Sequence, residues 1–206
     1  MDENAVTALD RSTSPHCTRS AHLRYTLTTP RLLLDHHRRP FILPIPRVRA
    51  LVLIDTNHLA ESPERREARV PQIARALAGE LDTVLIDEMK PLYLAPANRE
   101  DEALLALVLD MALTLGPDVF AAQSNALAAR RDYTAVLDAW REPTLLLCGE
   151  HDALCPPFRH RDMQVLMPQA ELVVLPDAGH LPTLETPETL GPVLERFFGR
   201  VATAAL

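Results

Sequence analysis

The most informative hydrophobic pattern lies in residues 143–180. Two short apolar runs, at residues 145–148 and 172–175, each lead into a turn that contains a glycine and an ionisable residue, Asp152 or His180. Runs of four or five apolar residues bounded by turn signals are typical of fully buried strands in a parallel sheet. The segment between the runs has the apolar spacing of a helix that closes at Pro168.

A strand, a helix and a second strand within about thirty residues form one βαβ crossover. Parallel neighbours end at the same edge of a sheet, about 4.8 Å apart, and open α/β sheets place their sites there. The pattern therefore predicts that Asp152 and His180 lie close together just beyond two strand ends. A carboxylate beside an imidazole at such an edge has the chemistry of the orienting acid and general base of a hydrolytic triad.

The rest of the chain divides into three parts. Residues 50–54 have the pattern of a third buried strand, and residues 187–198 that of a final amphipathic helix. The segment of about residues 57–140 is helical in pattern throughout. Residues 1–46 are rich in arginine, proline and histidine and have no periodic face, so we expect a mostly irregular segment with one candidate strand, at residues 22–28.

The helical segment contains start and stop signals for five helices. Ser62 and Pro63 begin the first, which Pro71 is expected to divide, and Asp101 lies at the start of the third. The remaining expected helices follow the apolar stripes and the Gly116-Pro117 break, at residues 81–89, 120–129 and 132–140.

Composition excludes several classes of function. The net charge of −7 argues against nucleic acid or an anionic membrane surface as a partner. The longest apolar run has seven residues, too few for a membrane span, and the N-terminus has no secretory pattern, so we expect a cytoplasmic protein. The three cysteines and the N-terminal histidines have no metal-ligand spacing, and we expect no metal and no cofactor.

Two motifs resemble a known family. Residues 149–156, Gly-Glu-His-Asp-Ala-Leu-Cys-Pro, resemble the turn after the penultimate strand of α/β-hydrolase-fold enzymes, and residues 178–188 resemble their Gly-His turn. Residues 47–56 resemble the strand that follows the nucleophile-bearing helix, and residues 57–140 resemble the helical cap. The resemblance covers about residues 47–200 and implies a partial α/β-hydrolase fold, with a few-stranded parallel sheet and an inserted cap. It also implies that Asp152 is the catalytic acid and His180 the catalytic base.

The nucleophile of such an enzyme is missing from the sequence. The five serines, at positions 12, 14, 20, 62 and 124, do not lie in a G-x-S-x-G elbow, and only six glycines occur in the chain. Cys155 is a weak alternative, because it lies on the acid's own loop. We therefore name no nucleophile.

The leading interpretation is a serine-type hydrolase of esters, lactones or related acyl substrates, inactive as written. Residues 1–46 have the composition that a shifted reading frame gives in a GC-rich gene, which suggests a disrupted N-terminal half. The alternatives are a non-catalytic binding protein and a half-domain that another chain completes. A sheet that ends at residues 50–54 is also expected to leave an open apolar edge and one under-covered face, through which the chain could self-associate.

Overall fold

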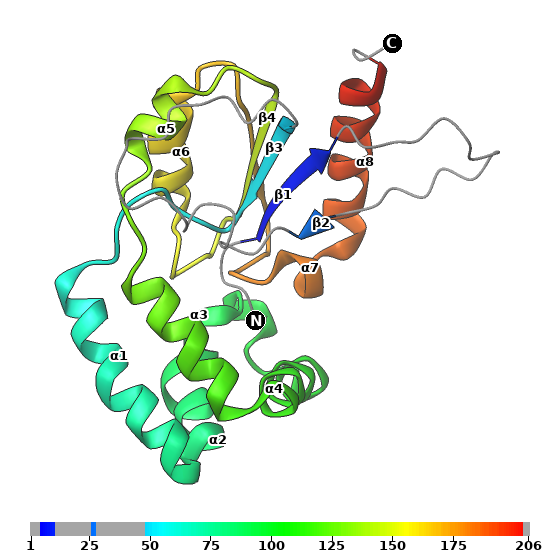
Figure 1. The fold of residues 1–206 in the computed structure, drawn as a ribbon. Coiled ribbons are helices and arrows are strands. Elements are labelled where there is room, and N and C mark those ends of the chain that lie inside the picture. The colour runs from blue at the N-terminus through cyan, green and yellow to red at the C-terminus, as the bar shows by residue number, and fades with distance from the viewer. Residues whose placement is uncertain (1–4, 11–25, 28–47, 204–206) are drawn as a thin grey trace, which may run out of the picture.

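The computed structural model describes residues 5–10, 26–27 and 48–203, and its core is a five-stranded sheet covered by helices (Figure 1). The strand order is β2-β1-β3-β4-β5. The strands are β1 (Ala5–Asp10), β2 (Thr26–Leu27), β3 (Val48–Ile54), β4 (Thr144–Gly149) and β5 (Glu171–Leu175). β3, β4 and β5 are parallel, which confirms the few-stranded parallel sheet that the apolar runs predict.

Both faces of the parallel strands are covered because successive side chains point to opposite faces. Leu145 and Leu147 of β4 pack toward α8 (Pro187–Thr203), together with Phe197 and Phe198. Leu146 points the other way, into a cluster with Leu137 of α5 (Thr134–Ala139) and Met163 of α6 (Pro157–Leu166). The expectation of an under-covered face is therefore wrong, because α8 covers one face of the sheet and α5 and α6 cover the other.

The expected open edge at residues 50–54 is also wrong. β1 pairs antiparallel with β3 along that edge, with Ala5 opposite Ile54 and Asp10 opposite Val48. β2 lies inside the stretch expected as the strand of the N-terminal segment. The rest of residues 1–46 lies outside the described residues, so its irregularity and the self-association of the chain stay predictions.

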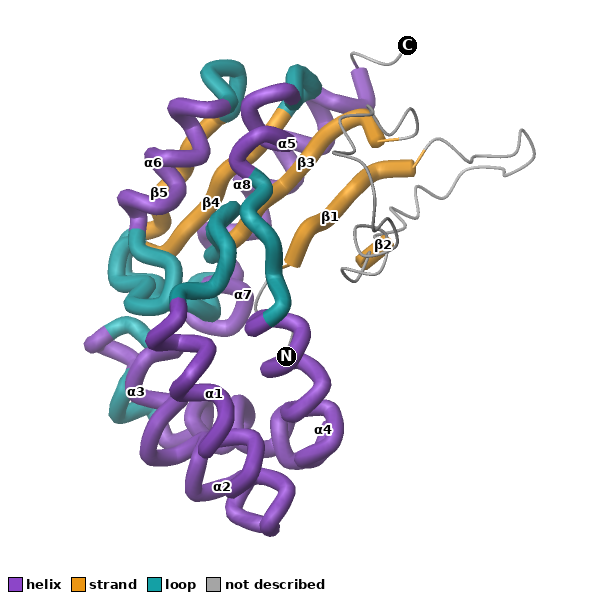
Figure 2. Tube along the Cα trace, turned by 60° about the vertical axis from the view of Figure 1, so that its left-hand side comes forward, coloured by secondary structure: helices purple, strands orange, loops and turns teal. Residues whose placement is uncertain are grey.

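A helical insertion connects β3 to β4 and lies beyond one end of the sheet (Figure 2). It contains α1 (Pro63–Arg75), α2 (Leu81–Val84), α3 (Lys90–Tyr93) and α4 (Glu102–Ala128), with π-helical turns at Ala76–Glu80 and Leu85–Met89 and a 3₁₀ turn at Pro96–Asn98. Ser62 and Asp101 cap α1 and α4 with their side-chain oxygens, as predicted. The predicted division at Pro71 is wrong, since α1 passes through it and the break falls at Gly79, where φ is 98°.

α4 is the one helix in the described ranges that is long and apolar enough to cross a membrane by length and composition. Its backbone, however, leaves the helical conformation at Gly116, where φ is 81° and ψ is 173°. The two arms, residues 102–115 and 117–128, are each shorter than the roughly 20 residues that a span requires. We therefore interpret α4 as part of the insertion, while the cytoplasmic location stays a prediction.

Candidate active site

Asp152 lies in the turn that follows β4, at the edge of the sheet where the three parallel strands end. The residue is 3% exposed, and its side chain is fully buried. Its Oδ1 accepts hydrogen bonds from the backbone N–H groups of Leu154, at 2.8 Å, and Cys155, at 2.9 Å. The turn therefore holds the carboxylate in one orientation and leaves Oδ2 to face the neighbouring loop.

His180 lies in the loop that follows β5 and is held by its neighbours on two sides. Its backbone N–H donates to the Tyr93 carbonyl at 2.7 Å, and its ring stacks on the Tyr93 ring at a centroid distance of 6.3 Å. The approach of these segments requires glycine. A Cβ atom at Gly179 would lie 2.5 Å from the Ala95 nitrogen, and one at Gly149 would lie 2.1 Å from the Gly179 carbonyl oxygen.

The structure brings Asp152 and His180 together, as the βαβ pattern predicts. Asp152 Oδ2 and His180 Nδ1 are 2.9 Å apart, and both residues are buried. Burial alone would raise the pKa of Asp152, but the hydrogen bond and charge of His180, with the two turn N–H groups, lower it below its usual range. An ionised carboxylate only accepts hydrogen bonds, so Nδ1 carries the proton and Nε2 of a neutral ring is left as the acceptor. The catalytic roles of both residues stay predictions.

Glu185, at the end of α7 (Pro182–Glu185), fixes the loop that carries His180. Its Oε1 accepts from the N–H groups of Gly179, at 2.8 Å, and Leu181, at 3.2 Å. Its Oε2 accepts from the Ala95 N–H at 2.7 Å and from the Asn98 side-chain amide at 2.9 Å. One carboxylate therefore ties both residues beside His180 to the helical insertion, a role that the sequence analysis did not predict.

Asp55 is a second carboxyl that the sequence analysis did not single out. It follows β3 directly, is 3% exposed and has a positive φ of 44°. Its Oδ1 accepts from the Gly149 N–H at 2.9 Å, whereas its buried Oδ2 has no hydrogen-bond partner among the described residues. Burial, together with the charge of Asp152, raises the pKa of Asp55 well above its usual range. Its position directly after a buried strand was the available signal, because Asp152 was likewise identified from its place in the turn that follows a strand.

Neither serine that the structure describes lies at the acid–base pair. Ser62 caps α1, and Ser124 is buried on α4, where it lines a cleft that does not include His180. Cys155 is closer: within the described chain, Asp152, Cys155 and His180 each place one potential ligand atom within 4.8 Å of the others. Three donors already occupy the Asp152 carboxylate, so this group is accounted for by an acid–base pair beside a thiol, and we assign no metal to it.

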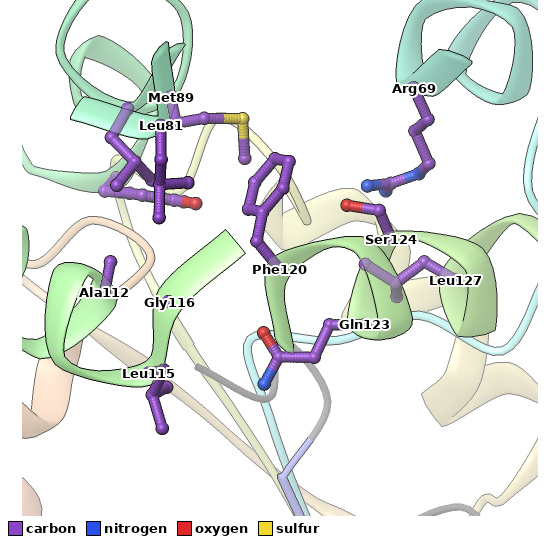
Figure 3. A pocket seen from close by; sticks show the side chains of 12 residues that line it. Arg69, Leu81, Met89, Ala112, Leu115, Gly116, Phe120, Gln123, Ser124 and Leu127 are labelled. Atoms are coloured by element: carbon purple, nitrogen blue, oxygen red, sulfur yellow. The ribbon is translucent and has the colours of Figure 1, made fainter. Parts of the chain in front are cut away.

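Two clefts lie in the helical insertion or between it and the site. The larger, of about 490 Å³ and open to solvent, lies inside the insertion (Figure 3). Its lining combines apolar side chains with a few polar ones, among them Leu81, Met89, Phe120, Arg69, Gln123 and Ser124. A smaller cleft of about 260 Å³ contains His180 and Cys155. Arg69 and Leu127 line both, so the apolar cleft adjoins the acid–base pair.

The solved structures similar to this chain include an esterase and an enol-lactonase. An esterase from Thermogutta terrifontis is 33% identical with a TM-score of 0.70, and the match covers 75% of this chain and 57% of the esterase. An enol-lactonase from Burkholderia xenovorans is 23% identical with a TM-score of 0.66, over 77% of this chain and 59% of the lactonase, a similarity that concerns the fold.

Curated relatives match over a shorter range. The protein provisionally named carbamate hydrolase RutD of Escherichia coli is 29% identical over 111 residues, which are 52% of this chain and 41% of RutD. The chain thus spans less than two thirds of the proteins that it matches. The sequence profile of the alpha/beta hydrolase fold matches residues 45–187. Because that match covers more than half of the sequence, the chain belongs to the alpha/beta hydrolase fold family.

Proposed function

We propose that residues 47–200 carry the acid–base half of a serine-type hydrolytic site for small esters, lactones or related acyl substrates. The observation that carries the proposal is the buried hydrogen bond of 2.9 Å between Asp152 and His180 at the edge where the parallel strands end. In this mechanism His180 Nε2 takes the proton of a serine hydroxyl as the oxygen attacks the acyl carbon, and returns it to the leaving group. Asp152 keeps the proton on Nδ1 and stabilises the imidazolium that forms.

We also propose that the chain as written has no serine-type turnover. Neither described serine lies at the pair, and the sequence has no G-x-S-x-G elbow. The first test is therefore the hydrolysis of p-nitrophenyl acetate by the intact chain. We expect no saturable rate above that of buffer. A saturable rate that His180→Ala abolishes, and that His151→Ala at the exposed neighbouring histidine leaves intact, would overturn the predicted inactivity.

The same assay distinguishes a thiol mechanism. Cys155 lies near the pair, and Asn57 Nδ2 donates to its Sγ at 3.6 Å. If a saturable rate is found and Cys155→Ser removes it, the nucleophile is the Cys155 thiol. If the rate survives that change, the nucleophile is another residue of the chain.

The acid–base role itself requires a nucleophile to act on. We would replace the residues before Val48 with the corresponding first half of the Thermogutta terrifontis esterase, which is expected to carry the elbow of the family. The chimera is expected to hydrolyse the ester with saturation and to lose at least about a thousandfold in kcat on His180→Ala or Asp152→Asn. A folded chimera whose rate is insensitive to both changes would contradict the proposal.

One observation favours a non-catalytic alternative. The apolar cleft lies within the helical insertion and does not include His180, so a ligand bound there would not meet the acid–base pair. Binding of an apolar acid or ester to the intact chain, unchanged in His180→Ala and lost in Phe120→Ala, would favour this binding role.

A further inference from the structure

Asp55 and Asp152 form a buried pair of carboxyl groups in which only one partner has a full set of hydrogen bonds. Asp152 accepts from two backbone N–H groups and from His180. Asp55 accepts from Gly149, while its Oδ2 is buried with no partner among the described residues. A buried polar atom without a partner destabilises the fold, so the unpartnered oxygen requires an explanation.

A proton on Asp55 explains it. Two buried carboxylates that interact repel each other when both are ionised, and one of the two then keeps its proton. The two turn N–H groups and His180 favour the ionised form of Asp152, whereas Asp55 receives a single N–H group. A protonated Oδ2 becomes a donor, and the acceptor with which Asp55 interacts is Asp152.

We propose that Asp55 is a neutral carboxylic acid that donates a hydrogen bond to Asp152 and positions the carboxylate that orients His180. The role of Asp55 as a positioning residue rests on the proposed function, because it requires Asp152 to be a triad acid. The hydrogen bond from Asp55 to Asp152 does not depend on that function. The backbone supports the assignment: the Asp55 N–H donates to the Leu147 carbonyl at 2.9 Å, and Gly149 donates to Asp55 Oδ1. These bonds tie the end of β3 to the strand that leads into the Asp152 turn. The positive φ of Asp55 is unusual for a residue with a side chain, and such strain concentrates at functional sites.

The two carboxylates that act on Asp55 both favour its neutral form. Asp152 from the turn after β4 and Glu185 from α7 both act on it with negative charge. The thiol of Cys148 on β4 also faces it, and burial raises the pKa of that thiol to about 12, so it carries no charge at neutral pH. These surroundings make an ionised Asp55 unfavourable over the pH range in which exposed carboxyl groups are charged.

The test combines infrared spectroscopy with unfolding, and neither requires turnover. The intact chain at pH 7 is expected to show the C=O stretch of a protonated carboxylic acid that Asp55→Asn removes. An asparagine accepts from Gly149 and donates to Asp152 without titrating, so Asp55→Asn should fold as the parent does. Above the ordinary pKa of 3.8, the unfolded parent loses a proton that the folded parent keeps. Its unfolding equilibrium constant should therefore rise, relative to that of Asp55→Asn, by about tenfold per pH unit until the raised pKa of Asp55 is reached.

Asp177→Asn is the matched control, because Asp177 also has a positive φ, of 59°, and its side chain is exposed. We expect no such pH dependence for it. Asp55→Ala, which removes both the acceptor and the donor, is expected to be less stable than Asp55→Asn at neutral pH. A parent spectrum without the acid band, a band that persists in Asp55→Asn, or equal pH slopes for parent and Asp55→Asn would each overturn the proposal. The chimera measures acid–base chemistry, so an inactive chimera would not contradict the hydrogen bond between Asp55 and Asp152. Equally, a failure of the infrared and unfolding tests would not contradict the proposed catalytic roles of Asp152 and His180.

Discussion

Glu185 offers the sharpest test of how the site is held together. Its two oxygens accept four hydrogen bonds, from the N–H groups of Ala95, Gly179 and Leu181 and from the Asn98 amide. The change Glu185→Gln keeps the shape of the side chain but leaves one oxygen, so about half of the donors would face an amide NH₂ group. A donor that loses its acceptor in a partly buried place costs about 1.5 kcal/mol. We therefore expect the free energy of unfolding to fall by about 3 kcal/mol.

The measurement is urea-induced unfolding followed by the fluorescence of Trp140, the one tryptophan of the chain. The midpoint should fall while the m-value stays constant, since the surface exposed on unfolding does not change. Glu195→Gln on the exposed side of α8 is the matched control and should cost less than about 0.5 kcal/mol. Amide exchange should also accelerate at Gly179 and Leu181, which flank His180. A Glu185→Gln variant as stable as the Glu195→Gln control would refute the idea that the four hydrogen bonds of Glu185 hold the site together.

Three further predictions follow from the packing and charges. Gly179→Ala places a Cβ 2.5 Å from the Ala95 nitrogen and should destabilise the fold by more than about 3 kcal/mol, whereas Gly199→Ala, with open space around it in α8, should stabilise it by about 0.5–1 kcal/mol; thermal melts compare the two. The Cys148 thiol, with its pKa raised to about 12, should resist iodoacetamide until the chain is unfolded in urea, and rapid labelling of the native chain, read by mass spectrometry, would contradict this. The lowered pKa of Asp152 stabilises the fold above the ordinary value of 3.8 and ceases to do so as the pH falls through the lowered pKa, so the stability gap between parent and Asp152→Asn should narrow in acid; a gap that is constant with pH would contradict it.

The features that the sequence predicted correctly are local ones. The strands β4 and β5 appear as apolar runs bounded by turns, and the geometry of one βαβ unit then brings Asp152 and His180 together. The caps of α1 and α4 are likewise properties of a few consecutive residues. Pro71 was misjudged because α1 has no buried residue. Pro71 has no N–H group, so the Glu67 carbonyl loses its partner within the helix. That carbonyl is exposed to water rather than buried in a core, so the loss costs little.

The features that escaped prediction depend on contacts between distant residues. β1 completes the edge of β3 although their paired residues are 38 to 49 positions apart, and a strand that pairs at an edge needs no distinctive apolar run. Asp55 acts through Gly149, and Glu185 through Ala95, each about 90 positions distant. A carboxyl at the end of a strand or in a short helix has no local pattern that distinguishes a buried clamp from a solvated side chain.

β1 runs in the direction opposite to that of the strand that precedes a nucleophile elbow. The bonds that hold Asp152 and His180 come from Leu154, Cys155 and Tyr93, all within residues 48–203, so this half of the fold organises the pair by itself. A nucleophile elbow follows the carboxyl end of a parallel strand at the same edge of the sheet. β1 takes the place beside β3 but runs antiparallel, so that its carboxyl end at Asp10 lies opposite Val48, at the far edge. The carboxyl end of β1 therefore lies at the edge opposite to the one that carries Asp152 and His180.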